Sequence, residues 1–290
     1  MNARPEPART ADVSGAARSY VRLLDGSRRP AFAFVHPVGG SVSGYVDVLA
    51  DLPSDAECVG LRARGLHPEG KPHRDIPAMA QQYLTELLAH HDPGQLVLGG
   101  YSFGGLVAWE MARLLRSRGR PPAGVVLLGT AVPRRNVPRA EHVDTFRQLV
   151  SAIYRVPAGQ LELDGLDDEE MVRSAARTAE RCDTLPVQYR NDDLERLFRV
   201  LALNLTMAHR YRVPPYDGTV HLVRPDRPDL QDTRRAWQEL CPGGLVTHDI
   251  GGPHNSLMSG TYGTRIAEFL AARWPDNATT SPHGNGANHD

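Results

Sequence analysis

The sequence predicts an α/β fold, in which helices cover both faces of a mostly parallel sheet and a helical lid is inserted after the fourth strand. Three observations predict it. Short apolar runs alternate with segments of helical periodicity, a serine flanked by glycines follows one run directly, and one long segment has helical periodicity without a strand pattern. Short buried strands that alternate with helices are typical of parallel sheets covered on both faces.

Six short apolar runs are the expected strands. Each run is bounded by Gly, Pro or polar residues and is shorter than a typical helix. The runs cover residues 31–35, 57–61, 96–98, 124–128, 219–223 and 244–248.

Apolar residues at helical spacing fill the segments between the runs. Outside the long segment, the sequence predicts helices over residues 76–90, 104–118, 229–240 and 259–272.

The long helical segment covers residues 133–214 and follows the fourth expected strand. It contains three helical patterns, over residues 142–155, 167–181 and 192–210. An insertion at this point lies over the carboxyl ends of the strands, where α/β sheets bind ligands. We interpret it as a lid; the alternative is a helical cap that only adds core.

Length, charge and cysteine content limit the class of protein. The 290 residues are enough to bury the core of one large domain. Lys and Arg number 33 against 34 Asp and Glu, so no basic face for nucleic acid is indicated. The three cysteines, Cys58, Cys182 and Cys241, are far apart in the sequence. Their spacing argues against a disulfide framework or a metal site and favours a reducing compartment.

Both ends of the chain are predicted to be disordered. Residues 1–16 are polar and rich in Pro and Ala, and residues 276–290 contain few apolar side chains. The folded domain is therefore expected over residues 17–275. No run is long enough to span a membrane and no signal-peptide pattern is present, so we expect a cytoplasmic protein with no membrane partner.

Ser102 is the expected catalytic nucleophile. It is the centre of a G-x-S-x-G pentapeptide over residues 100–104, with an apolar run before it and a helical pattern after it. This order of strand, sharp turn and helix is the nucleophile elbow of α/β-hydrolases. The flanking glycines let strand and helix pack closely around the serine. The alternative is a glycine-rich turn with an incidental serine.

His254 is the expected general base, because a serine hydroxyl is a poor nucleophile until a base takes its proton. His254 lies in a glycine-rich loop directly after the last expected strand, and α/β-hydrolases order their triad as serine, acid, histidine. The acid is then expected at the end of an earlier strand. Asp226 follows the fifth run directly, and Asp229 is its rival three residues later. An N-cap aspartate is the alternative for Asp226.

Two backbone N–H groups are expected to form an oxyanion hole. One belongs to Phe103, the residue after the nucleophile. The other is assigned to Val38, in the loop His36–Gly40 that follows the first expected strand. Glycines in that loop let the chain approach a substrate closely.

The chain resembles the thioesterase domains that release products from non-ribosomal peptide synthetases and polyketide synthases. The resemblance extends from about residue 20 to residue 272 and is carried by several matching segments. It implies an acyl-enzyme on the serine, formed from a thioester on the phosphopantetheine arm of an acyl or peptidyl carrier protein. No cofactor or metal of the enzyme is implied. The matching segments include residues 34–40, 62–66, 79–83, 98–105, 108–112, 211–218 and 251–254.

One position departs from the resemblance. Peptide-synthetase thioesterases usually end the strand after the elbow helix with Leu-Leu-Asp, and that aspartate is their triad acid. Here Gly129 follows Leu128 and carries no carboxylate. Free-standing editing thioesterases of these pathways place the acid after the following strand, and Asp226 matches that position.

Several functions are compatible with these residues. We expect a thioesterase that releases its acyl chain by hydrolysis or by cyclisation. A type II editing thioesterase, a carboxylesterase on free esters and a non-catalytic binding protein are the alternatives. The initial methionine, with no carrier-protein sequence upstream, favours a discrete enzyme over an excised terminal domain.

Overall fold

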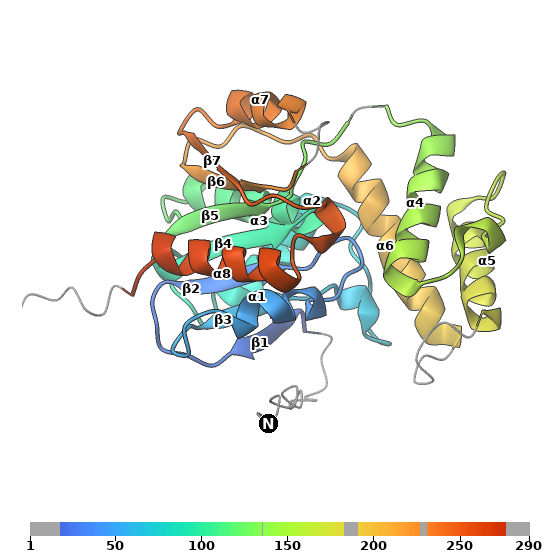
Figure 1. Cartoon of the computed structure of the whole chain (residues 1–290), viewed down its shortest axis with the longest axis horizontal. Coiled ribbons are helices and arrows are strands. Elements are labelled where there is room, and N and C mark those ends of the chain that lie inside the picture. The colour runs from blue at the N-terminus through green and yellow to red at the C-terminus, as the bar shows by residue number, and fades with distance from the viewer. Residues whose placement is uncertain (1–17, 135, 183–190, 227–230, 277–290) are drawn as a thin grey trace, which may run out of the picture.

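A seven-stranded sheet lies at the centre of the computed structural model, which describes residues 18–134, 136–182, 191–226 and 231–276 (Figure 1). The strand order is β1-β3-β2-β4-β5-β6-β7. Only the edge strand β1 is antiparallel to its neighbour, and every other pair is parallel. The strands are β1 (Tyr20–Leu24), β2 (Ala31–Val35), β3 (Cys58–Leu61), β4 (Leu96–Tyr101), β5 (Gly124–Leu128), β6 (Val220–Arg224) and β7 (Leu245–Asp249).

All six strands expected from apolar runs are present, which confirms the predicted sheet. The strand β1 was not predicted, and its sequence explains why. Its residues are only partly buried and Arg22 is solvent-exposed, so no apolar run marks it. Backbone pairing with β3 holds β1 in the sheet, and the Glu86 carboxylate accepts hydrogen bonds from the N–H groups of Ser19 and Tyr20.

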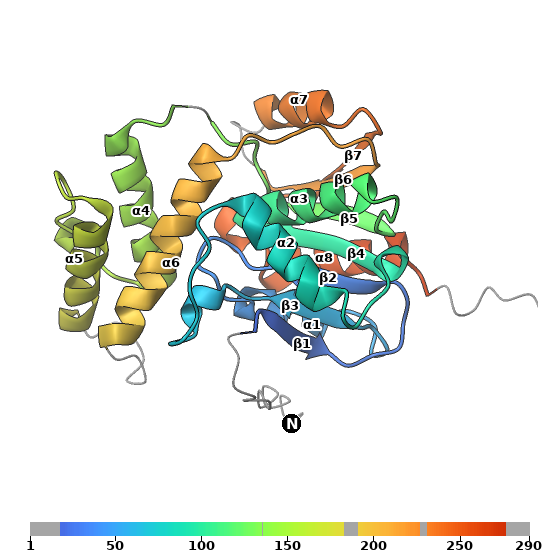
Figure 2. The ribbon, with the colours of Figure 1, turned by 180° about the vertical axis from the view of Figure 1, so that it is seen from behind.

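Helices cover both faces of the sheet (Figures 1 and 2). The side chains of α2, α3 and α7 contribute to one core, in which the rings of Trp109 and Trp237 lie 4.7 Å apart. The helices α1 and α8 contribute to the core of the other face. These helices are α1 (Val46–Ala50), α2 (Ile76–Leu87), α3 (Phe103–Ser117), α7 (Gln231–Leu240) and α8 (Gly260–Arg273).

In the described residues between β5 and β6, three α-helices form the predicted helical insertion. They are α4 (Arg139–Tyr154), α5 (Asp168–Arg181) and α6 (Asn191–Arg210). Both views show them gathered beyond one end of the sheet (Figures 1 and 2). They bury a separate hydrophobic core that includes Phe146, Met171 and Phe198. Because the insertion has its own core, it is more than a loop laid over the sheet.

Three expectations fall on residues that the structure does not describe. They are the disorder of residues 1–16, the disorder of residues 277–290 and the role of Asp229. Asp276 was also expected to be disordered, but the structure describes this residue. Its carboxylate accepts a hydrogen bond from the N–H of Arg29 at 3.2 Å.

The start of α3 lies unusually close to β2. A Cβ atom at Gly104 would lie 2.3 Å from the carbonyl oxygen of Val35 and 2.7 Å from that of His36. A Cβ at Gly100 would lie 2.3 Å from the backbone carbon of Gly104. Glycines at both positions therefore bring strand and helix close together.

We expect Gly104→Ala to lower the free energy of unfolding by about 3 kcal/mol, because the new methyl group meets fixed backbone atoms. Urea titration followed by circular dichroism measures it. Gly159→Ala is the matched control, since nothing lies within 4 Å of a Cβ at that position. Equal stability of the two variants would contradict the close packing.

Candidate active site

Ser102 lies on a sharp turn between a strand and a helix. It follows the last residue of β4 and precedes the first residue of α3. Its backbone has φ 54° and ψ −116°, and a positive φ is uncommon for a residue with a side chain. The N–H of Ser102 donates to the carbonyl of Leu128 in β5 at 2.8 Å. The expected strand–turn–helix geometry is therefore present, with Ser102 at the N-terminus of α3.

His254 is held beside this turn by neighbours of Ser102. The hydroxyl of Tyr101 donates to the carbonyl of His254 at 2.7 Å, and their two rings stack with centroids 4.9 Å apart. On another side, the imidazole lies against Gly129. A Cβ at position 129 would lie 3.0 Å from Nδ1 of His254. Tyr101 directly precedes Ser102, and Gly129 directly follows Leu128, whose carbonyl accepts from the N–H of Ser102. The elbow and the histidine loop therefore meet at one place.

Gly129 is more than a position without a carboxylate. Its φ is +57°, and the imidazole of His254 lies within 3.0–3.2 Å of the position that a Cβ would take. A Cβ there would also lie 2.9 Å from the Leu257 side chain. The absence of a side chain at residue 129 therefore leaves room for the imidazole of His254 in its present position.

Asp226 is joined to the loop that carries His254. Its N–H donates to the carbonyl of Gly252 at 2.8 Å, and its Oδ2 accepts from the N–H of Gly252 at 3.3 Å. The side chain is exposed. The end of β6 is thus fastened to the chain two residues before His254.

The two expected oxyanion donors belong to segments that lie against each other. Val38 lies in a turn closed by a 2.9 Å hydrogen bond from the N–H of Gly40 to the carbonyl of Pro37. Phe103 begins α3, and the next residue, Gly104, packs on the end of β2. Among the backbone hydrogen bonds of the described residues outside helices and strands, none is donated by the N–H of Val38 or Phe103.

Sequence reasoning assigned no role to two buried side chains that join these segments. The hydroxyl of Tyr45 donates to the carbonyl of Val35 at 2.6 Å and accepts from the N–H of Tyr101 at 2.8 Å. His36 is fully buried, and burial lowers the pKa of its imidazole to about 4. Hydrogen bonds made by side chains in this way leave no periodic signal in a single sequence.

The insertion packs directly on the turn that carries Val38. The side-chain amide of Asn204 on α6 donates to the carbonyl of Val38 at 2.8 Å. A Cβ at Gly39 would lie 3.7 Å from Ile153, and one at Gly40 would lie 2.7 Å from Val200. Residues of α4 and α6 therefore cover the turn between them.

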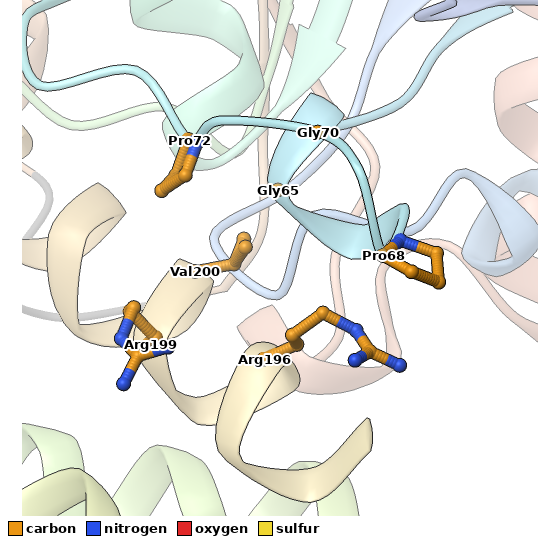
Figure 3. Close-up of a pocket in the computed structure, with 7 residues that line it drawn as sticks. All are labelled: Gly65, Pro68, Gly70, Pro72, Arg196, Arg199 and Val200. Carbon is orange, nitrogen blue, oxygen red and sulfur yellow. The ribbon is translucent and has the colours of Figure 1, made fainter. Parts of the chain in front are cut away.

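A small cavity marks another contact between the insertion and the rest of the domain. It has a volume of about 120 Å³ and lies between α6 and the loop after β3 (Figure 3). The two arginines on its α6 side are ion-paired, Arg196 with Asp193 and Arg199 with Glu169. Pockets for small ligands usually exceed about 300 Å³, so this cavity does not have the size of an acyl-chain site. Its lining residues are Gly65, Pro68, Gly70, Pro72, Arg196, Arg199 and Val200.

Neither a metal cluster nor a membrane-spanning helix is found in the described residues. No three His, Cys, Asp or Glu side chains in that part of the chain are grouped as metal ligands. None of its helices is both long and apolar enough to cross a bilayer.

A mostly parallel sheet with a serine elbow after its central strand is the fold of an α/β-hydrolase. Comparison with known families narrows this class. Residues 30–273 match the family described as Thioesterase domain, and the chain belongs to that family. Membership implies thioester hydrolase activity, as the resemblance had indicated.

The similar curated proteins are multidomain synthases. The chain is 27% identical over 271 residues to a probable nonribosomal peptide synthetase, CymA, of Salinispora arenicola, covering 89% of this chain and 3% of that protein. It is 24% identical over 281 residues to a dimodular nonribosomal peptide synthase of Bacillus subtilis, covering 89% and 11%. A non-reducing polyketide synthase of Aspergillus terreus, curS2, matches at 24% identity over 89% of this chain and 12% of its own length. The chain thus spans a small part of these relatives.

Solved structures share the fold. The thioesterase domain of Vlm2, bound with a dodecadepsipeptide, superimposes with a TM-score of 0.69 at 22% identity, covering 88% of this chain and 97% of that one. The NocB thioesterase domain from the nocardicin cluster gives 0.61 at 22% identity, covering 89% and 100%. A four-domain nonribosomal peptide synthetase bound to AMP and glycine gives 0.74 at 24% identity, covering 89% and 20%.

We expect Gly129→Ala to lower thioester turnover at least tenfold, because its methyl group would lie 3.0 Å from Nδ1 of His254 and shift the imidazole away from its position. Steady-state kinetics measures kcat. Gly119→Ala is the matched control: Gly119 also has a positive φ, +70°, but nothing lies within 4 Å of its Cβ position. Each variant costs about 1 kcal/mol of stability from the backbone conformation alone. Equal kcat in the two variants would show that Gly129 does not place His254.

Proposed function

We propose that this chain is a serine thioesterase of natural-product biosynthesis. It takes an acyl, peptidyl or polyketide chain from the phosphopantetheine thioester of a carrier protein and releases it by hydrolysis or cyclisation. Membership of the thioesterase family supports the reaction class, and the synthases among its relatives support the carrier-bound substrate. The observation that carries the mechanism is Ser102 in its left-handed turn, with His254 packed beside it on Gly129.

In the proposed first half-reaction, Oγ of Ser102 attacks the thioester carbonyl carbon and His254 takes the hydroxyl proton. The negative charge that develops on the carbonyl oxygen is bound by the N–H groups of Val38 and Phe103. The carbon–sulfur bond then breaks, and the proton passes from His254 to the departing sulfur. The products are an acyl ester on Ser102 and a free carrier thiol.

In the second half-reaction, water or an internal amine or hydroxyl of the acyl chain attacks the ester. His254 takes the proton of the attacking group and returns it to Oγ of Ser102 as the ester bond breaks. This scheme uses no metal and no cofactor of the enzyme, since the phosphopantetheine belongs to the carrier.

Asp226 is the proposed acid of the triad. It orients the His254 ring and stabilises the imidazolium. Its hydrogen bonds to Gly252 support this assignment, because they bring a carboxylate to the loop of His254. Asp229 remains the alternative.

The insertion α4–α6 is proposed as the lid of the acyl site. Its contacts with the turn that carries Val38 support this role. A lid that excludes water favours an internal nucleophile, and an open one favours hydrolysis.

A second candidate, the editing thioesterase, is favoured by Gly129. Gly129 supplies no carboxylate, so the acid is expected after β6, as in free-standing editing enzymes. An editing enzyme would remove aberrant acyl groups from carriers, so a comparison of short-chain with peptidyl carrier thioesters separates the two roles.

We expect Ser102→Ala to lower thioester turnover more than about 10³-fold while the protein stays folded. Short-chain and peptidyl thioesters, each on a carrier protein, are compared with free p-nitrophenyl esters, and mass spectrometry detects the acyl-enzyme. Ser117→Ala, at the far end of α3, is the control and keeps wild-type activity. Full activity of Ser102→Ala would refute the mechanism, and a higher kcat/KM on free esters would identify a carboxylesterase.

We expect Asp226→Asn to reduce kcat by about 10³–10⁴-fold, the loss expected when a triad carboxylate is removed. Asp249→Asn serves as the control, because Asp249 is exposed at the end of a strand and pairs with Arg224. Near wild-type activity in Asp226→Asn, with an inactive Asp229→Asn, would transfer the role to Asp229. Activity in both variants would indicate a Ser–His dyad.

A further inference from the structure

His36 is a buried polar residue that the proposed mechanism does not use. It has no exposed surface and lies between the end of β2 and the turn that carries Val38. Its Nδ1 lies 2.7 Å from the carbonyl oxygen of Pro37, and its Nε2 lies 2.8 Å from the hydroxyl of Tyr83 on α2. Its ring also stacks with that of Phe103 at a centroid distance of 5.8 Å. One side chain thus contacts the surroundings of both proposed oxyanion donors.

The chemistry of its partners assigns the tautomer of His36. Burial lowers the pKa of the ring to about 4, so the ring is neutral near pH 7 and carries one proton. A carbonyl oxygen only accepts, so the proton is on Nδ1 and is donated to Pro37. Nε2 is then an acceptor and receives the hydroxyl proton of Tyr83. The carbonyl of Arg62 is a longer, secondary partner of that hydroxyl at 3.2 Å.

The Pro37 carbonyl and the Val38 N–H are opposite ends of one planar peptide unit. A hydrogen bond that fixes the oxygen therefore fixes the direction of the N–H as well, and polarises it toward a stronger donor. The next peptide unit is held from the other side, because Asn204, itself buried, donates to the carbonyl of Val38. Val38 thus has both of its peptide units fastened by buried side chains.

We propose that His36, held by Tyr83, is a positioning residue that aims the Val38 N–H at the oxyanion of the acyl-transfer reaction. The inference rests on the proposed function, in which the Val38 and Phe103 N–H groups bind that oxyanion. A donor fixed before the reaction needs no reorganisation when charge develops. The side chain of Phe103, whose N–H is the second proposed donor, stacks on the same His36 ring.

Three variants test the hydrogen-bond path. His36→Leu removes both ring nitrogens, Tyr83→Phe removes only one hydroxyl, and His36→Asn keeps an amide N–H close to the position of Nδ1. The control is His221→Leu, because His221 is also buried and hydrogen-bonded but lies on β6 among His248 and Arg273. Circular dichroism first shows that each variant is folded at the assay temperature.

The readouts are kcat and KM on an acyl thioester, and the rate at which a fluorophosphonate labels Ser102. We expect His36→Leu to lower kcat and labelling about 10–100-fold at constant KM, because a mis-aimed donor loses most of the benefit of one oxyanion contact. Tyr83→Phe is expected to lower kcat and the labelling rate about three- to tenfold, which is part of that effect. His36→Asn recovers most of the wild-type rate, and His221→Leu matches wild type.

Three outcomes would overturn the proposal. Wild-type kcat and labelling in folded Tyr83→Phe and His36→Leu would remove the role of His36 and leave the thioesterase function intact. A His36→Asn variant as slow as His36→Leu would assign the effect to ring packing on Phe103. Absence of labelling and turnover in the wild-type protein would instead refute the proposed function, and with it this inference.

Discussion

The backbone of Ser102 is the constraint on which the rest of the site depends. A positive φ at a residue with a side chain costs about 1–3 kcal/mol and persists only where the surroundings fix it. Here β5 holds its N–H through Leu128, and α3 is pressed onto β2 through Gly104. The strained turn directs the start of α3 toward the end of β2, so the Phe103 and Val38 segments become neighbours. The site is therefore a product of close backbone packing before any side chain is considered.

Two independent cores meet at the turn that carries Val38. The sheet side contributes the buried His36, and the insertion contributes Asn204 together with Val200. The insertion has its own hydrophobic core, so its helices approach this turn as a packed unit. A displacement of α6 would alter the hydrogen bond to the Val38 carbonyl. Substrate enclosure and charge stabilisation are therefore linked through the same few backbone atoms in the proposed mechanism.

Much of the fold was predictable because its signals are local. Buried parallel strands leave apolar runs, and the pentapeptide around Ser102 leaves a glycine pattern, so sheet, helices and elbow follow from single segments of sequence. The edge strand at Tyr20–Leu24 leaves no such run, because pairing to β3 and the Glu86 carboxylate hold it. The contact between Gly129 and His254 joins residues far apart in the chain, and no pattern within either segment encodes it. Asp226 was expected as the triad acid from its position directly after the fifth apolar run, whereas its hydrogen bond from Gly252 emerges only in three dimensions.

The space that His254 occupies above Gly129 has an evolutionary consequence. In the synthetase domains that this chain resembles, the equivalent strand end carries an aspartate. A lineage that moved its acid from one strand to the next also had to adjust the histidine ring, because a Cβ at residue 129 would lie 3.0 Å from Nδ1 of His254. The strand end at Gly129 and the loop at His254 are therefore expected to diverge as a unit, so that exchanging one of them between relatives requires exchanging the other.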